Sequence, residues 1–452
     1  MNVSILGTGY VGLTTGVCLA FLGHKVTCVD PDKRKIDALE RGEVPFHEPH
    51  LAELIAQARH NLTFTTEYNT AIPNSQVVFI AVGTPTGDGG APDLQYLRSA
   101  ASGIGACLGP HFTVIVNKST VPIGSGSWVG SLVRDAVEAN GGVRGTFAVA
   151  SNPEFLREGT ALHDSLYPDR VVIGADESKT AEVLYSLYRP MLDQTFLPPA
   201  FLPRPDRMAA VPLISTDLAS AELIKYAANA FLATKITFIN EIADLCEKVD
   251  GDVQDVARGI GLDNRIGGKF LHPGPGYGGS CFPKDTLALL KTAEDFESPL
   301  RIIEAVTKVN DSRKRAMGRK VIEALGDAPR GKKVALLGLT FKPNTDDMRD
   351  APSLAIAQAL VDAGVEVVAY DPEGMELAAP MMPEVAMASD PYAAAEGAHA
   401  IVIVTEWDVF RALDLARIRQ LAADAVLVDL RNIYLPEEIR AAGFRYSSIG
   451  RA

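Results

Sequence analysis

Three glycines directly after a short apolar run limit how this chain can begin its fold. Residues 2–6 (NVSIL) are typical of a buried strand, and Gly7, Gly9 and Gly12 follow at the spacing G-x-G-x-x-G. Residues 11–21 have helical character, so the glycines lie between a strand and a helix. Glycines there allow a tight turn and let a pyrophosphate approach the helix N-terminus, where free N–H groups favour anions. The pattern predicts a dinucleotide-binding turn.

An acidic residue at the end of the next expected strand specifies the dinucleotide. Residues 25–30 (KVTCVD) end in Asp30, about 20 residues after the glycines, where such units place the acid that binds the adenosine ribose. A carboxylate there accepts hydrogen bonds from ribose hydroxyls and repels a 2′-phosphate. We therefore expect NAD rather than NADP, although Lys35 close by weakens the repulsion.

Further apolar runs alternate with helical patterns along the first half of the chain, at 77–82, 112–116, 147–150 and 171–174. This alternation indicates βαβ units and a parallel sheet. After the proline-rich stretch 198–212 the pattern changes, because 216–249 contains no Gly or Pro and carries apolar residues at helical spacing. The sequence predicts a long helix there.

The second half of the chain returns to the first pattern. Helical residues continue to about 325, interrupted by the Gly-rich loop 267–280, and strand-like runs then follow at 333–339, 365–370, 400–404 and 426–430. Both second strands end in Asp-Pro, as two copies of one unit would. With 452 residues, the chain also exceeds what one core of about 250–300 residues can use.

We therefore predict an α/β fold with two Rossmann-like, doubly wound parallel-sheet domains joined by a central helical domain that contains the long helix. The expected domains are 1–205, 206–325 and 326–452.

Composition excludes several classes of function. The net charge is −13 and no Lys/Arg stripe is present, which argues against nucleic-acid binding. The apolar runs are short and no basic segment precedes them, which argues against a signal peptide or membrane span. The five cysteines have neither CxxC nor His spacing, so we expect no disulfide framework and no metal site. A cytoplasmic enzyme is the expectation.

One cysteine lies in a context that favours reactivity. The segment from His272 to Asp285 reads HPGPGYGGSCFPKD, and its glycines let the backbone press against a bulky ligand. Pro283 suits the first turn of a helix and places Cys281 at the positive helix end, which lowers a thiol pKa. Asp285 then follows one turn later. The alternative is a buried structural cysteine beside a flexible loop.

Lys225 and Asn229 lie four residues apart on the predicted long helix, within AELIKYAANAF. A cation and an amide on one helix face can stabilise an oxyanion or bind a substrate hydroxyl. The alternative is a solvated surface lysine, but the helix is apolar enough that this face should border a core or cleft.

Two carboxylates follow the expected strand at 147–150. In SNPEFLREG, Asn152 can cap a short helix that starts at Pro153, which would put Glu154 and Glu158 one turn apart. Two such charges would raise at least one carboxyl pKa, as acid–base catalysis requires. A solvated turn is the alternative. Thr120, in VNKSTVP, is either a polar strand end or a hydroxyl that holds water.

The segment 338–353 (GLTFKPNTDDMRDAPS) follows the first strand of the second α/β domain, where a Rossmann-like unit binds phosphate. It offers Lys342 and Arg349 in place of a glycine fingerprint. These cations can bind an anion or can pair with Asp346, Asp347 or Asp350.

Taken together, these motifs resemble the UDP-glucose/GDP-mannose dehydrogenase family over nearly the whole chain. The matching segments are GTGYVG at 7–12, GTPTG at 83–87, NKSTVP at 117–122, NPEFLREG at 152–159, the KYAANAF helix, GGSCFPKD at 278–285 and FKPNTDDMRDAPS at 341–353. The resemblance implies an N-terminal NAD domain, a central helical dimerisation domain and a C-terminal domain that holds the nucleotide of a nucleotide sugar.

The resemblance also implies residue roles. Cys281 would be the nucleophile, Lys225 and Asn229 would stabilise the oxyanion, Asp285 with Thr120 would orient or activate water, and Glu154 and Glu158 would serve thioester hydrolysis and positioning. The cofactor contacts would be Gly7, Gly9, Val11, Gly12, Asp30, Lys35, Thr86, Thr120, Glu158 and Arg349. The substrate contacts would be Glu154, Phe155, Leu156, Arg157, Glu158, Lys225, Asn229, Phe270, Leu271, His272, Pro273, Gly274, Gly278 and Lys342, with Arg265 reaching across a dimer interface.

The implied reaction is the oxidation of a nucleotide-sugar alcohol to a carboxylate in two hydride transfers, through a thiohemiacetal and a thioester on the cysteine. GGSCFPKD and DDMRDAP resemble the UDP-glucose branch more than the branches acting on GDP-mannose or UDP-N-acetylhexosamines, which remain alternatives. A catalytically inactive NAD-binding or scaffold protein is a further alternative, and NAD reduction would separate it from an enzyme. We expect UDP-glucose as substrate and a homodimer or higher oligomer.

Overall fold

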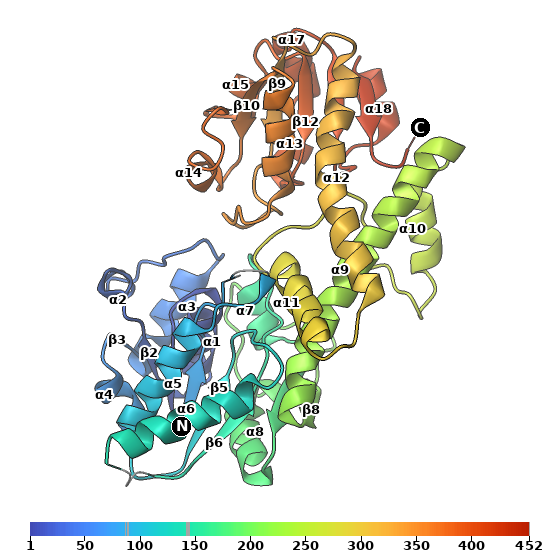
Figure 1. The fold of residues 1–452 in the computed structure, drawn as a ribbon. Helices are drawn as coiled ribbons and strands as arrows, with labels where there is room; N and C mark the ends of the chain where they lie inside the picture. Colours follow the sequence, from blue (N-terminus) through green and yellow to red (C-terminus); the bar gives the residue numbers. More distant parts are fainter. Residues whose placement is uncertain (86, 88–89, 142–144, 452) are drawn as a thin grey trace. The chain divides into compact units, whose positions relative to one another are not determined.

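Two compact units make up the chain in a computed structural model that describes residues 1–85, 87, 90–141 and 145–451 (Figure 1). The units are Met1–Ala227 and Ala228–Ala452, and the boundary falls within one long helix. The division into three domains at 205 and 325 stays a prediction.

The first unit is built on an eight-stranded sheet with the strand order β3-β2-β1-β4-β5-β6-β7-β8. Its first six strands have the 3-2-1-4-5-6 order of a dinucleotide-binding fold. The expected strands are confirmed, whereas the short β3 and the half-exposed β8 were missed. The strands are β1 (Asn2–Leu6), β2 (Lys25–Val29), β3 (Leu62–Thr65), β4 (Val77–Ile80), β5 (Thr113–Asn117), β6 (Phe147–Ser151), β7 (Val171–Ala175) and β8 (Leu213–Thr216).

The parallel direction is confirmed for β1 to β6, and β7 departs from it by pairing antiparallel with β6. Only two residue pairs form, Ala150 with Ala175 and Ser151 with Gly174, so β7 starts beyond the carboxyl end of β6. The connection contains one helix, α7 (Ala161–Leu166), of six residues. Such a helix spans about 9 Å, too little to carry the chain back along a strand of about 17 Å. Residues 152–160 therefore stay at the carboxyl edge of the sheet.

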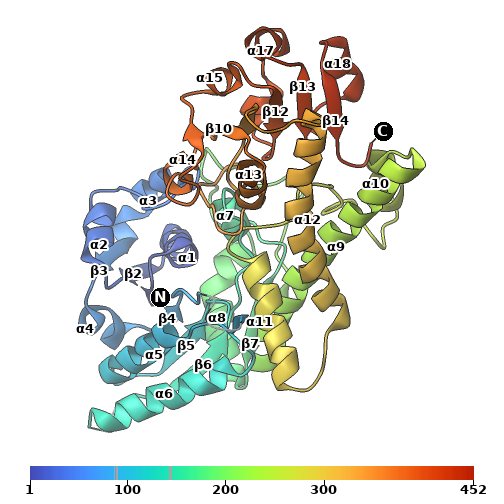
Figure 2. The same cartoon turned by 45° about the horizontal axis from the view of Figure 1, so that its top comes forward.

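Helices cover both faces of this sheet. Because side chains alternate along a strand, Val77 and Phe79 of β4 join one core and Val78 and Ile80 join the other. The first core contains α1 (Tyr10–Phe21) and α3 (Leu51–Ala58), and the second contains α5 (Gln95–Cys107) and α6 (Ser125–Ala139), which lie side by side (Figure 2). The remaining helices are α2 (Lys33–Glu40), α4 (Tyr68–Ala71), α8 (Ser178–Leu192) and the 3-10 turns η1 (Arg59–Asn61) and η2 (Ile72–Asn74).

The predicted long helix is α9 (Leu218–Val249), which has 32 residues without Gly or Pro (Figure 1). It buries Tyr226, Ala233 and Ile239 but leaves Phe231 and Phe238 half-exposed or more. Neither α9 nor any other helix in the described part of the chain is long and apolar enough to cross a membrane.

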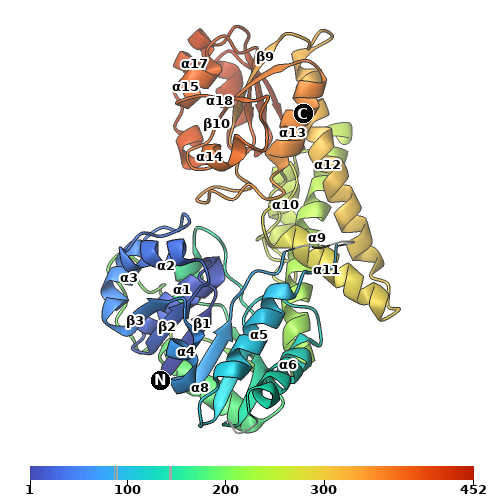
Figure 3. The ribbon, with the colours of Figure 1, turned by 60° about the vertical axis from the view of Figure 1, so that its left-hand side comes forward.

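The second unit repeats the architecture of the first with a wholly parallel sheet of order β11-β10-β9-β12-β13-β14. Helices α12 and α13 cover one face, and α15, α17 and α18 cover the other (Figure 3). The strands are β9 (Lys333–Leu337), β10 (Glu366–Tyr370), β11 (Ala386–Met387), β12 (Ala400–Ile403), β13 (Val426–Asp429) and β14 (Arg445–Ser448). The helices are α10 (Val253–Gly261), α11 (Phe282–Asp295), α12 (Arg301–Leu325), α13 (Pro352–Asp362), α14 (Met375–Ala378), α15 (Pro391–Ala395), α16 (Asp408–Arg411), α17 (Leu415–Leu421) and α18 (Pro436–Ala441).

The shared Asp-Pro feature corresponds to one repeated backbone arrangement. Gly7 and Gly338 follow the first strand of each sheet with φ of 99° and 94°, and each donates its N–H to the last residue of the second strand. Asp30 then accepts hydrogen bonds from the turn of the first unit, as Asp371 does in the second. Asp371 is fully buried and also accepts the Trp407 indole N–H, so its oxygens face only the protein.

Candidate active site

The three glycines of the turn before α1 have different surroundings: close backbone contacts require Gly7 and Gly12, whereas Gly9 borders open space. An added Cβ on Gly7 would lie 2.5 Å from the carbonyl oxygen of Ala81, and one on Gly12 would lie 2.0 Å from that of Gly7. Gly9 differs, because its φ of −72° suits any residue and an added Cβ would meet no atom within 4 Å. No acidic side chain occupies the first turn of α1. Open space before free N–H groups fits the pyrophosphate of NAD.

Asp30 lies directly against this turn, as predicted. It is 6% exposed, its Oδ2 accepts hydrogen bonds from the N–H and hydroxyl of Thr8, and its Oδ1 accepts the N–H of Asp32. A carboxylate has about four acceptor positions, so one remains for a ribose hydroxyl. Lys35 Nζ lies 3.9 Å from Asp30 Oδ2. Its positive charge therefore partly offsets the repulsion that the Asp30 carboxylate would exert on a 2′-phosphate. Val11 is half-buried on α1, and Thr86 lies outside the described residues.

A buried ion pair joins the carboxyl edge of the first sheet to α9. Lys225 Nζ donates to Glu154 Oε1 at 2.8 Å, and both side chains are about 5% exposed or less. Leu156 N–H donates to Glu154 Oε2 at 2.6 Å. Burial raises the pKa of Glu154, but the Lys225 ammonium and these hydrogen bonds outweigh burial and hold that pKa below its ordinary value. The solvated alternatives for Lys225 and Glu154 are therefore wrong.

The expected short helix at Pro153 is also wrong. Residues 152–157 are irregular and α7 begins only at Ala161, so Glu154 and Glu158 are not one helical turn apart. Asn152 does not cap a helix, because its side-chain oxygen accepts from Lys118 Nζ and the Tyr188 hydroxyl. The predicted rise of a carboxyl pKa does not occur at Glu154, because its partner is a cation rather than Glu158.

Lys118 is a site residue that the sequence analysis did not single out. Its Nζ donates to Asn152 Oδ1 at 2.8 Å, and burial lowers its pKa to about 8, with the Glu154 charge opposing and the Lys225 charge adding to this effect. Two cations thus act on Glu154. The position of Lys118 in NKSTVP, two residues before Thr120, was the available signal. Thr120 itself is half-buried, and its carbonyl oxygen accepts the Thr84 hydroxyl.

In the second unit, Cys281 lies where the Pro283 pattern placed it. It is the N-cap of α11, its Sγ lies 3.4 Å from the Ser280 hydroxyl, and it is partly exposed. Asp285 is 1% exposed, and its Oδ2 accepts the Asn229 amide at 2.6 Å. Lys284 Nζ lies 3.1 Å from Asp285 Oδ1. A partly exposed thiol at a helix N-terminus is the setting that favours a thiolate, and it argues against a buried structural cysteine.

The glycines before Cys281 have a structural reason of their own. An added Cβ on Gly279 would lie 2.7 Å from the Phe341 ring, and one on Gly278 would lie 2.3 Å from the carbonyl oxygen of Asp350. Gly279 N–H also donates to the carbonyl of Arg349. The loop therefore presses against the segment after β9, which brings the Cys281 loop and the predicted cationic segment together.

The two predicted cations of that segment differ. Arg349 is 65% exposed in its side chain and pairs with Asp347 at 2.7 Å, which is one of the alternatives from the sequence. Lys342 Nζ lies 5.4 Å from the centre of the Phe341 ring. Arg431, after β13, was missed because no motif marks it; its guanidinium donates to the Phe341 carbonyl oxygen and lies next to Gly274.

The other predicted substrate residues form the loop that leads to these glycines. Leu271, Pro273, Gly274 and Gly278 are buried, whereas His272 is exposed and Phe270 has a positive φ of 64°. Gly274 is held through its N–H by Asn240 and through its carbonyl by Arg313. Arg265 is 89% exposed in its side chain and pairs with Asp263.

The predicted residues therefore fall into two groups. The first unit contains the glycine turn with Asp30, the Thr120 segment, and the buried pair of Glu154 and Lys225. The second brings together Asn229, Asp285, Cys281, the 270–279 loop and Lys342. Lys225 and Asn229 lie one turn apart on α9.

A second residue missed by sequence reasoning, Glu222, lies one turn before Lys225 on α9. It is 3% exposed, and its carboxylate accepts the backbone N–H of Gly124 at 2.7 Å and of Gly126 at 2.9 Å. It therefore caps α6, the helix that follows the Thr120 segment. Burial raises the pKa of Glu222 to about 7, although the two N–H groups act in the opposite direction.

Models of one protein family match most of the chain. The NAD binding domain of the UDP-glucose/GDP-mannose dehydrogenase family matches residues 1–192, its central domain matches 219–312, and its UDP binding domain matches 335–436. The chain is 56% identical to a UDP-glucose 6-dehydrogenase of Rhizobium meliloti (strain 1021) and 44% identical to one of Bacillus subtilis (strain 168). The matches cover all of this chain, with 100% and 93% of those proteins.

Solved structures of nucleotide-sugar dehydrogenases are also similar to this chain. A UDP-glucose dehydrogenase from the archaeon Pyrobaculum islandicum superposes with a TM-score of 0.88 at 36% identity, covering 100% of this chain and 98% of that one. A UDP-D-ManNAc dehydrogenase from Pyrococcus horikoshii gives 0.83 at 26% identity, covering 100% and 99%.

We predict that Glu222→Gln removes part of the pH dependence of stability. Since the folded pKa of Glu222 is about 7 against an ordinary 4.5, its contribution is present below pH 4.5 and is lost as pH rises through 7. Relative to wild type, the variant should gain on the order of 1–3 kcal/mol between pH 5 and 8. Thermal melting at pH 5, 6, 7 and 8 measures this, with the exposed Glu182→Gln as control. A melting difference that stays constant with pH would contradict it.

Proposed function

Because the chain belongs to the UDP-glucose/GDP-mannose dehydrogenase family, we propose that it oxidises C6 of UDP-glucose to the carboxylate of UDP-glucuronate. It is an NAD-dependent dehydrogenase, and each NAD, when bound, supplies the acceptor for one hydride. The observation that carries the proposal is the placement of Cys281 at the N-terminus of α11, with Asp285 and Asn229 in contact one turn later. An enzyme that stopped at the aldehyde would not need this thiol.

Cys281 makes the second oxidation possible. After the first hydride leaves C6, the thiolate adds to the aldehyde carbon, which forms a C–S bond and a thiohemiacetal oxyanion. Loss of the second hydride gives a thioester. Water then attacks the carbonyl carbon and the C–S bond breaks, which releases the carboxylate and restores the thiol. UDP-glucose, two NAD⁺ and one water thus give UDP-glucuronate, two NADH and three protons.

Asn229 and Lys225 are the proposed donors to the oxyanion. The Asn229 amide carries two N–H donors, and the bond to Asp285 uses one and fixes the orientation of the other. Glu154 keeps Lys225 charged, because burying an ammonium without a carboxylate would disfavour its ionised form. Asp285 and Glu154 therefore act indirectly. They position the Asn229 amide and the Lys225 ammonium before negative charge develops on the substrate oxygen.

The hydrolytic water is assigned to Asp285 with Thr120, and Glu154 and Glu158 are proposed to assist hydrolysis and to position the substrate. The ionised Glu154 can accept a proton but not donate one. The proposed nucleotide-sugar contacts remain residues 154–158, Lys225, Asn229, 270–274, Gly278, Lys342 and, from a partner subunit, Arg265. The proposed NAD contacts remain the glycine turn with Val11, Asp30, Lys35, Thr86, Thr120, Glu158 and Arg349.

A homodimer built on α9 is part of the proposal. Phe231, Phe238 and Leu245 recur every seven residues and are 65%, 49% and 56% exposed. Apolar side chains at that spacing form one stripe, as in helices that pack against a partner helix. The exposed Arg265 guanidinium suits a residue that reaches a neighbouring subunit. All five cysteines are free, which suits the reducing cytoplasm, where we place the enzyme.

We predict that wild-type enzyme forms two NADH per UDP-glucose, because the thiohemiacetal stays covalently bound between the oxidations. NADH absorbance at limiting sugar measures the ratio. UDP- and GDP-sugars tested in parallel identify the substrate, and faster oxidation of GDP-mannose or a UDP-N-acetylhexosamine would favour those alternatives. A ratio of one with free aldehyde would exclude the thioester.

We also predict that Cys281→Ser stops release of the acid while NADH binding is kept. A serine alkoxide can add to the aldehyde, but oxygen is a poorer leaving group than sulfur, so a covalent ester should accumulate. Mass spectrometry after incubation with UDP-glucose and NAD should show the adduct, with turnover reduced by at least about 100-fold. Cys107→Ser is the matched control and should turn over normally. Normal turnover by Cys281→Ser would make the residue structural.

The dimer is tested by Phe238→Asp. A carboxylate in the centre of the apolar stripe should convert the dimer to a monomer in light scattering, because the charge would be buried without a partner. Phe296→Asp, at an equally apolar and 71% exposed position at the end of α11, is the control and should leave the mass unchanged. A dimeric Phe238→Asp protein would argue against this interface.

A further inference from the structure

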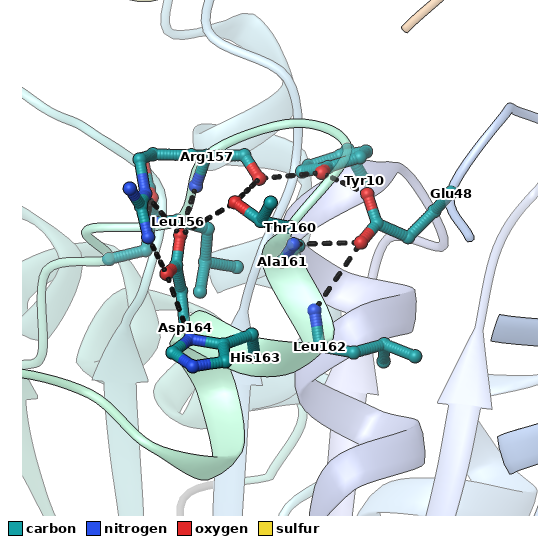
Figure 4. A network of polar contacts seen from close by, with 10 residues as sticks. Tyr10, Glu48, Leu156, Arg157, Thr160, Ala161, Leu162, His163 and Asp164 are labelled. Atoms are coloured by element: carbon teal, nitrogen blue, oxygen red, sulfur yellow. Dashed lines mark hydrogen bonds and ion pairs between the residues drawn. The ribbon is translucent and has the colours of Figure 1, made fainter. Parts of the chain in front are cut away.

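A buried carboxylate outside the residues assigned so far connects the two ligand-binding parts of the first unit. Glu48 lies between α2 and α3 and is 7% exposed. Figure 4 shows its carboxylate between the Tyr10 hydroxyl and the backbone where α7 begins. Tyr10 donates to Glu48 Oε2 at 2.5 Å, and Gly159 N–H donates to the same oxygen at 2.7 Å. Ala161 N–H donates to Oε1 at 2.7 Å.

Tyr10 belongs to the glycine turn of residues 7–12, which we call the cofactor turn because it is the proposed site of the NAD pyrophosphate. It is the residue between Gly9 and Val11 and the first residue of α1, so its backbone forms part of the proposed pyrophosphate site. Its ring packs against Phe46, two residues before Glu48, with centroids 5.1 Å apart. Burial and the adjacent carboxylate raise the pKa of Tyr10, so its hydroxyl stays protonated and donates.

The other side of the network is the segment proposed to contact the nucleotide sugar. The Tyr10 hydroxyl also lies 3.1 Å from the carbonyl oxygen of Arg157, and Arg157 is held in turn by Asp164 (Figure 4). Gly159, with φ of 78°, turns the chain so that its N–H reaches Glu48. Glu154 and Glu158 therefore lie on a segment whose end is held by Glu48.

We propose that Glu48 is a positioning residue that couples the cofactor turn to residues 154–162 through Tyr10, an arrangement we name the Tyr10–Glu48 clasp. Its role in catalysis rests on the proposed function, in which 154–158 contacts the nucleotide sugar. The coupling itself requires only NAD binding. When the dinucleotide orders the N-terminus of α1, it also orders Tyr10, and the hydrogen bonds through Glu48 transmit that order to Gly159 and Ala161.

The chemistry of the clasp requires a carboxylate. The partners of Glu48 are all donors, namely one phenol and backbone N–H groups. A glutamine would present one NH₂ group to donors and break the contacts on one side. Tyr10→Phe is the finer change, because it removes the link to the cofactor turn and leaves Glu48 bonded to Gly159 and Ala161.

The test is hydrogen exchange of the amides of residues 157–162 with and without saturating NADH, for wild type, Tyr10→Phe, Glu48→Gln and the control Glu53→Gln. We expect NADH to slow exchange about tenfold in wild type and in the control, whose side chain is exposed. In Tyr10→Phe and Glu48→Gln the effect of NADH should fall below about twofold. A purely structural cap predicts a different result, since Tyr10→Phe would then respond to NADH as wild type does. That result would overturn the proposal.

Turnover supplies a second, independent readout. Glu48→Gln should lower kcat/KM for UDP-glucose about tenfold with the NADH Kd changed less than about threefold, and the double variant with Tyr10→Phe should be no worse than Glu48→Gln alone. If the double variant instead lost kcat/KM by the product of the two single-variant losses, the two residues would act separately, and the clasp proposal would be overturned. The exchange experiment contains no nucleotide sugar, so a wild-type enzyme inactive on UDP-glucose would contradict the proposed function while the clasp is still judged from NADH.

Discussion

The parallel direction of six adjacent strands is the constraint on which the chemistry of the first unit depends. Parallel strands end at one edge of a sheet, so groups that follow different strands meet there although they are far apart in the sequence. Gly7 follows β1, Asp30 follows β2, Thr120 comes after β5 and Glu154 comes after β6. The antiparallel β7 extends this edge, because the chain does not have to cross back and residues 152–160 remain beside the cofactor turn.

Buried charged groups lie at this carboxyl edge of the sheet. Lys225 and Glu154 are almost fully buried, and removing one partner of such a pair leaves an uncompensated charge that costs about 3–5 kcal/mol. Burial raises the pKa of Glu154, yet the Lys225 ammonium 2.8 Å away helps to hold that pKa below its ordinary value. Both members of this ion pair are therefore shielded from water. Lys118 adds a second cation, and burial lowers the pKa of Lys118 to about 8, while the nearby Glu154 charge acts in the opposite direction.

Local sequence patterns predicted several of the observed elements, because glycine and proline are favoured in only a few backbone conformations. Glycines at G-x-G-x-x-G spacing after a strand, Pro283 after a cysteine, and the long run without Gly or Pro each indicated the element that the structure has. The pattern misled where a polar side chain had a choice of partners. Asn152 before Pro153 has the form of a helix cap, but Lys118 and Tyr188 take its oxygen, and the helix begins eight residues later at Ala161.

The sequence by itself determined the α/β fold class, the dinucleotide turn with its acidic residue, and the candidate nucleophile at a helix start, because each depends on backbone geometry within a few residues. Tertiary structure alone decided which charges pair and which carboxylates are held by donors. Glu154 and Lys225 are 71 positions apart in the sequence, and Glu222 is 96 and 98 positions from its two partners at the start of α6. Glu48 is 38 positions from Tyr10 and 111 positions from Gly159. Electrostatic and hydrogen-bond energies depend on distance and burial in space, and no local spacing encodes either.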